Sequence, residues 1–182
     1  MKNVLCAFAL AALALASAPA SPKSQTIRLE ISGASLAKPL EVTDAAILDR
    51  FSIWNGPGVR VNDQAIHMEP ADQERIGAFI DWPRGMVSIL PSGLQRYDVT
   101  FHQGGRERMH EWHRRYVIRY EYDPSTEGGY IYLPGPTDGD DYKRNVFSIV
   151  HGIEGNWFHS SAAWERLVRP LIDKAVAAGR SG

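Results

Sequence analysis

The chain has 182 residues, with 20 basic and 21 acidic side chains and a formal net charge of −1. This balance leaves no basic stripe to neutralise phosphates, so the composition argues against a nucleic-acid partner. The single cysteine, Cys6, lies within the first twenty residues. Beyond them, no disulfide framework, cysteine-based metal site or cysteine nucleophile is expected.

Residues 1–20 have the pattern of a secretory signal peptide. Lys2 precedes an apolar run over residues 4–16, and small residues follow at Ala18 and Ala20. A positive start, a short apolar core and a small-x-small ending predict cleavage after Ala20, and the run is too short to cross a membrane. We therefore expect export to the periplasm or the medium. A single globular domain is expected over residues 21–182, with no transmembrane segment.

The N-terminal half is expected to form short strands and one helix. Strands are predicted over residues 26–32, 40–42, 77–82, 86–90 and 95–102. The first of these alternates, with Ile27, Leu29 and Ile31 on one face, which is typical of a half-buried strand. Asp44 is a candidate N-cap for a helix over residues 45–51.

The best-specified local structure is a β-hairpin over residues 116–133. Aromatic and branched residues favour strands on both sides of the sequence Asp123-Pro124-Ser125, which favours a turn. Gly128 and Gly129 allow positive φ where the chain enters the second strand. If Tyr122 lies opposite Tyr130, then Tyr120 lies opposite Tyr132, and the four tyrosines share one face.

This tyrosine face is the predicted binding site. A tyrosine ring takes apolar contact while its hydroxyl stays hydrated, so the residue tolerates a half-exposed position. An envelope glycan or an extended peptide is the expected partner. The competing interpretation is that a C-terminal helix covers the rings, which are then core residues. The predicted ligand-binding residues are Tyr120, Tyr122, Tyr130, Tyr132 and Trp112.

The C-terminal part is predicted to contain a second hairpin-like pair, over residues 145–150 and 156–159, and then a helix capped by Ser160 or Ser161. Pro170 either kinks that helix or begins a new one. Its expected buried stripe is Trp164, Leu167, Leu171 and Ala175. Together these elements predict an α+β fold with a mainly antiparallel sheet, as a sandwich or partial barrel. A short helix in the N-terminal half and a C-terminal helix complete it.

Two clusters contain residue types that bind metals, and neither is predicted to be a metal site. His110 and His113 would share a helix face, but their spacing is not that of H-E-x-x-H, and the arginines that follow disfavour a cation. An acidic loop offers oxygen ligands for calcium but lacks the spacing of an EF-hand. It contains Asp138, Asp140 and Asp141. No metal or cofactor is therefore expected.

No catalytic residue is predicted either. The chain has no G-x-S-x-G elbow, and no spacing links a serine, a histidine and an aspartate. The expected function is a non-catalytic binding or interaction domain of the cell envelope. The alternative is a hydrolase that acts on an envelope or extracellular polymer.

Several short elements carry a resemblance to a known group of proteins. They are Ile31-Ser32-Gly33, the segment from Pro39 to Asp44, the segment from Tyr130 to Gly135, Trp157, and the segment from Ser160 to Trp164. In these elements the chain resembles small exported bacterial proteins of unknown function. The resemblance implies an exported protein with one domain and attaches no activity to it.

Overall fold

The computed structural model describes residues 25–33, 35–54, 60–61, 64–65, 78–104 and 115–180. The strands are β1 (Gln25–Gly33), β2 (Leu40–Val42), β3 (Arg60–Val61), β4 (Gln64–Ala65), β5 (Met86–Val87), β6 (Gln95–Gly104), β7 (Arg115–Tyr122), β8 (Gly129–Leu133) and β9 (Asn156–His159). The α-helices are α1 (Ala45–Leu48), α3 (Asp140–Ser148), α4 (Ala162–Leu167) and α5 (Arg169–Arg180). Two 3-10 turns are η1 (Trp82–Arg84) and η3 (Pro136–Asp138).

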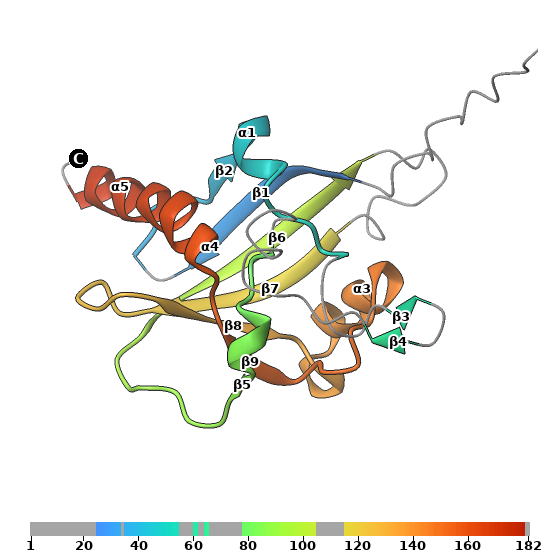
Figure 1. Cartoon of the computed structure of the whole chain (residues 1–182). Coiled ribbons are helices and arrows are strands. Elements are labelled where there is room, and N and C mark those ends of the chain that lie inside the picture. The colour runs from blue at the N-terminus through green and yellow to red at the C-terminus, as the bar shows by residue number, and fades with distance from the viewer. Residues whose placement is uncertain are drawn as a thin grey trace, which may run out of the picture.

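Seven strands form one antiparallel sheet in the order β2-β1-β6-β7-β8-β9-β5, and β3 and β4 form a separate pair. The predicted α+β class with a mainly antiparallel sheet is confirmed. The large sheet is a single open layer with β2 and β5 as its edges, rather than a sandwich or a partial barrel. Figure 1 shows α1, α4 and α5 gathered on one side of this sheet. We call that side the inner face and the opposite side the outer face.

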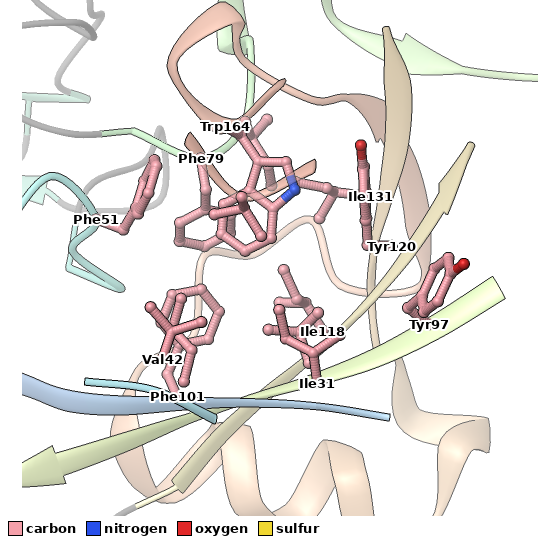
Figure 2. Close-up of a cluster of buried hydrophobic side chains, with 14 of the residues drawn as sticks. Ile31, Val42, Phe51, Phe79, Tyr97, Phe101, Ile118, Tyr120, Ile131 and Trp164 are labelled. Atoms are coloured by element: carbon pink, nitrogen blue, oxygen red, sulfur yellow. The ribbon is translucent and has the colours of Figure 1, made fainter. Parts of the chain in front are cut away.

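The inner face is the hydrophobic core, and it follows from the alternation of buried and more exposed side chains in β6 and over residues 118–122 of β7. Tyr97, Val99 and Phe101 in β6 are fully buried, opposite buried residues of β7. Trp164 of α4 enters the middle of this cluster, between Phe79 and Tyr120 (Figure 2). Burying such large aromatic side chains is a main source of stability in a domain of this size.

The predicted strand at the N-terminus is confirmed as β1, but one of its residues faces the wrong way. Leu29 and Ile31 are buried, whereas Ile27 is 58% exposed. The pairing of β1 with β6 shifts between Thr26 and Arg28, so that Ile27 sits in a bulge. A bulge adds one residue to one strand and so turns the side chains before it to the other face.

The strand predicted over residues 145–150 is wrong, because residues 145–148 belong to α3. β8 pairs only with residues 119–122 of β7 and does not reach Val117. There the side chain of Asn145 takes the place of a strand partner. The Val117 N–H donates to Asn145 Oδ1 at 2.7 Å, and Asn145 Nδ2 donates to the Val117 carbonyl at 2.7 Å. The strand expected over residues 156–159 is present as β9, but it pairs with β8 and β5.

Two more predicted strands are shorter than expected. In the described part of the strand predicted over residues 77–82, a single bridge joins Ile80 to Ser160. In the strand predicted over residues 86–90, only Met86 and Val87, which form β5, pair with another strand.

The C-terminal helix is broken into two at Val168. Ser161 caps α4, because its Oγ accepts from the Trp164 N–H at 3.1 Å, and α5 begins at Arg169, just before Pro170. The proline therefore begins a new helix instead of kinking one. Because α5 starts afresh, the buried stripe differs from the predicted one after Trp164. The fully or nearly buried positions are Trp164, Val168, Ile172 and Val176, and Leu167, Leu171 and Ala175 are half-buried.

Candidate functional site

The predicted hairpin exists as β7 and β8, but its register differs from the predicted one. Tyr122 lies opposite Gly129, and Tyr120 lies opposite Ile131. Gly129 has to occupy this place, since a Cβ atom there would lie 2.6 Å from the Tyr120 ring and 3.1 Å from the Glu165 carboxylate. A slip of one residue moves every side chain of a strand to the other face. The prediction that four tyrosines share one face is therefore wrong.

Tyr120 and Tyr122 belong to the inner face, and both rings are fully buried. The Tyr120 hydroxyl donates to Glu165 at 2.8 Å, and the Tyr122 hydroxyl donates to Asp173 at 2.7 Å. Burial is the main cause that raises the pKa of both phenols, and the neighbouring carboxylates raise each pKa further. Both rings are thus covered by the C-terminal helices, as the competing interpretation expected, and a ligand cannot reach them.

Arg169 of α5 holds these helices to the hairpin turn. Its guanidinium lies over the Tyr122 ring, 4.4 Å from the centroid, and pairs with Glu165 at 3.2 Å. It also donates to the carbonyls of Asp123 and Thr126 at 2.9 and 2.8 Å. A guanidinium with this many partners fixes geometry, so we read this cluster as structural.

Tyr130 and Tyr132 belong to the outer face, where they stand in two rows of side chains that cross the sheet. In the first row, Tyr132 lies between Trp157 of β9 and Arg119 of β7. The Tyr132 and Trp157 ring centroids are 5.0 Å apart. The Arg119 guanidinium carbon is 5.0 Å from the Tyr132 centroid. Arg119 in turn lies beside Asp98 of β6.

The second row is parallel to the first and nearer to the hairpin turn. Tyr130 lies between His159 of β9 and Glu121 of β7, with 5.3 Å between the Tyr130 and His159 ring centroids. Arg96 of β6 lies beside Glu121. We call the six half-buried residues of the two rows the outer-face patch. It consists of Arg119, Glu121, Tyr130, Tyr132, Trp157 and His159.

The charges of the outer-face patch are only loosely paired. Arg119 lies 3.8 Å from Asp98 and 4.0 Å from Asp138, and its Nε has no hydrogen-bond partner among the described residues. Partial burial raises the pKa of Glu121, although Arg119 and Arg96 act to lower it. Groups that have lost water without gaining strong partners can gain more from a bound partner than well-paired groups can.

The remaining titratable groups of the patch have ordinary structural explanations. The Tyr132 hydroxyl donates to Asp138 at 2.8 Å, and burial is the main cause that raises its pKa. Burial also lowers the pKa of His159, with a further lowering from Arg84 and an opposing effect from Asp81. The patch is therefore a set of stacked aromatic and charged side chains, with a nearly balanced charge.

The acidic loop does not converge on one point. Asp138 accepts from Tyr132 and from the Gly135 N–H, whereas Asp140 and Asp141 lie in the first turn of α3 beside Lys143 and Arg144. Over the ranges that the structure describes, no group of three histidine, cysteine or acidic side chains is placed to hold a metal ion. Trp112, His110 and His113, which the sequence analysis singled out, lie outside the described residues.

Reasoning from the sequence missed Arg119, Glu121, Trp157 and His159 as members of a surface cluster. Alternation in β7 does carry the signal, because Arg119 and Glu121 must face away from the buried tyrosines. The pairing of β8 with β9, which brings Trp157 and His159 beside the tyrosines, has no comparable signal in the sequence.

Comparison of the chain with protein-family models, with curated proteins and with solved structures gave no match. Of the helices in the described part, none is long and apolar enough to span a membrane.

Proposed function

We propose that the protein is an exported, non-catalytic binding domain of the cell envelope, and that it holds a polypeptide partner on the outer-face patch. The observation that carries the proposal is the row Trp157–Tyr132–Arg119 on a sheet face opposite the helices of the core. Tryptophan, tyrosine and arginine are the residue types that most often dominate the energy of protein–protein interfaces. Loosely paired charges around them favour a partner with polar groups of its own.

A polypeptide fits this row better than a glycan does. Sugars bind aromatic side chains by lying on a free ring face, and both faces of Tyr132 have neighbours at about 5.0 Å, Trp157 on one side and Arg119 on the other. The parts left to a ligand are ring edges, hydroxyl groups and the rims of the guanidinium and carboxylate groups. Backbone amides and mixed side chains complement such a surface.

The described histidines have structural contacts, and none of them is paired with a serine. Among the described residues, no serine hydroxyl is hydrogen-bonded to a histidine ring. His102, for example, contacts Glu30 at 3.2 Å and Arg28 at 3.3 Å. Nucleophilic catalysis needs a nucleophile within reach of a base that a third group orients. The described part of the chain contains no serine–histidine pair of this kind, and His67, His110 and His113 lie outside it.

The experiment uses two probes, a random dodecapeptide phage library and a set of soluble peptidoglycan fragments. We expect peptides selected on the wild-type protein to bind the patch. Trp157→Ala and Arg119→Ala should then each weaken their binding at least tenfold, the loss expected of an interface hot spot. Affinity is measured by fluorescence anisotropy with labelled peptides.

The matched control is Lys174→Ala, because Lys174 is an exposed residue on α5, on the helical side of the molecule. This variant should bind the selected peptides like the wild type. Circular dichroism checks that all variants are folded. Selected peptides that bind both patch variants with unchanged affinity, or binding by peptidoglycan fragments alone, would contradict the proposal.

A further inference from the structure

The edge strand β5 and the loop after it form an exposed aliphatic segment. Residues 86–94, M-V-S-I-L-P-S-G-L, contain no charged side chain. Ile89 is 85% exposed and Met86 is 60% exposed, which makes them the two most exposed large hydrophobic residues in the described part of the chain. Figure 1 shows this chain leaving β5 and swinging away from the body of the domain before it enters β6. We call residues 86–94 the edge loop.

The opposite edge of the same sheet is protected in the usual way. Charged residues and proline along an edge strand prevent unwanted association. At β2, Lys38 and Pro39 precede the strand, Glu41 lies within it, and Asp44 follows it. The edge loop carries no charge of this kind, although Pro91 interrupts it. Its exposed aliphatic side chains therefore mark a surface that something covers.

Two exposed arginines flank the edge loop. Arg84 precedes it in η1, and Arg96 follows it in β6. No ion pair to Arg84 is found within the described ranges, and Arg96 has a weak surface pair with Asp98 at 3.4 Å. An aliphatic segment with a basic side chain before and after it in the sequence matches the interface of an anionic bilayer, where apolar groups enter and cations stay with the headgroups.

The neighbouring strand adds side chains of the same kind. Val87 of the edge loop lies opposite Trp157, and Tyr130 and Tyr132 follow on β8. Tryptophan and tyrosine are enriched at membrane–water interfaces because one end of the side chain is apolar and the other is wet.

We propose that the edge loop is a membrane-contact site for anionic phospholipid, with Met86 and Ile89 in the interfacial layer and Arg84 and Arg96 at the phosphates. A lipid surface fits better than a second copy of the chain paired along β5. A second copy would bring another uncharged segment, which offers the two arginines no additional acidic partner. Two aliphatic side chains and two cations give weak, reversible binding. The edge loop borders the outer-face patch, because Val87 pairs with Trp157, and the two proposals are distinguished by their variants, Ile89→Asp for the bilayer and Arg119→Ala for the peptide.

The test is co-sedimentation with vesicles of phosphatidylcholine alone and of phosphatidylcholine with 30% phosphatidylglycerol. Protein purified from an exporting bacterium is used, and its N-terminus is sequenced so that residues 1–20 cannot carry the binding. We expect binding to the anionic vesicles that 0.5 M salt reduces, because salt screens exposed charges. Ile89→Asp should lower the partition coefficient at least fivefold.

The matched control is Ile27→Asp, which places the same charge on an aliphatic side chain of similar exposure to Met86, in β1. The partition coefficient of this variant should fall only by the effect of one added negative charge. Ile89→Asp adds the same charge, so any larger fall in that variant comes from the loss of the Ile89 side chain. Arg84→Gln with Arg96→Gln should reduce the preference for anionic over neutral vesicles.

Three outcomes would overturn the proposal. One is the absence of binding to anionic vesicles, and another is an equal loss in Ile27→Asp and Ile89→Asp. The third is a dimer in sedimentation velocity that Ile89→Asp dissolves while no vesicle binding is seen, which would assign the edge loop to a second copy of the chain.

Discussion

Asn145 is the residue through which α3 replaces a missing strand. Its amide satisfies both backbone groups of Val117 in a buried position. Asn145→Ala removes both partners at once and leaves a buried N–H and a buried carbonyl unpaired. Each such group costs about 1–3 kcal/mol, so for the two groups we expect the free energy of unfolding to fall by about 2–6 kcal/mol. Urea denaturation followed by circular dichroism measures it.

The control for this prediction is Lys143→Ala, an exposed position on the same helix. Surface substitutions of this kind usually change stability by less than about 0.5 kcal/mol. Equal stability of the two variants would mean that α3 does not depend on the amide of Asn145.

At the residue scale, His151 makes the stability of the folded protein depend on pH. It is 2% exposed, packs beside the rings of Trp82 and Tyr116, and neither ring nitrogen has a hydrogen-bond partner in the described part of the structure. Burial lowers its pKa, and this effect outweighs the opposing effect of the Glu154 carboxylate. The folded protein therefore keeps His151 neutral at pH values where the unfolded chain already binds a proton.

The sign of the resulting pH effect follows from linkage. The stability contributed by neutral His151 is complete above the ordinary histidine pKa of about 6.5, and it is lost as pH falls through the lower folded pKa. We expect His151→Phe to lose less stability than the wild type between pH 7 and pH 5, as measured by urea unfolding at several pH values. His102 and His159 also have lowered pKa values, so a residual slope remains. Parallel pH profiles of the wild type and the variant would count against this account.

At the scale of elements, the C-terminal helices determine which tyrosines of the hairpin are buried. Trp164 is fully buried and contacts the rings of Phe51 and Tyr120 at centroid distances of 5.0 and 5.7 Å. Trp164→Ala should lower the free energy of unfolding by about 3–5 kcal/mol, the usual cost of such a truncation. Thermal and urea unfolding measure it. Wild-type stability would mean that α4 is not docked on the sheet.

A matched substitution separates the core position from the half-buried one. Leu167 was predicted to share the buried stripe, but it is half-buried in the structure. The free energy of unfolding should therefore fall clearly less in Leu167→Ala than in Trp164→Ala, because the Leu167 side chain buries less apolar surface on folding.

At the scale of the whole molecule, the sequence predicted those parts that depend on local chemistry. The alternation of Tyr97, Val99 and Phe101 predicts β6 correctly, and Asp44 and Ser161 cap the helices that follow them. These features depend on neighbours within a few residues. The class of the fold follows from them, because many short strands with two helical segments allow few arrangements.

The parts that could not be predicted depend on contacts between distant segments. The hairpin register is fixed where Gly129 meets Tyr120 and Glu165, and α3 is fixed by the pairing of Asn145 with Val117. Of the predicted site, Tyr130 and Tyr132 face outward, while Tyr120 and Tyr122 are buried under helices that come much later in the chain. A one-residue slip is invisible to a pattern of alternating aromatic residues but decides which face each one occupies.

Both proposals place the protein in the cell envelope, and export is the last prediction. Lys2, the apolar run over residues 4–16 and the small residues Ala18 and Ala20 motivate it. When the gene is expressed in a bacterium, we expect the protein in the periplasm or medium with Ser21 as its first residue, as read by N-terminal sequencing. Ala20→Leu should block or displace the cut, because the cleavage site requires a small residue there, whereas Ala11→Ser in the apolar run should leave it in place. A protein that still begins at Met1 and stays in the cytoplasm would contradict export and the envelope location in the proposed function.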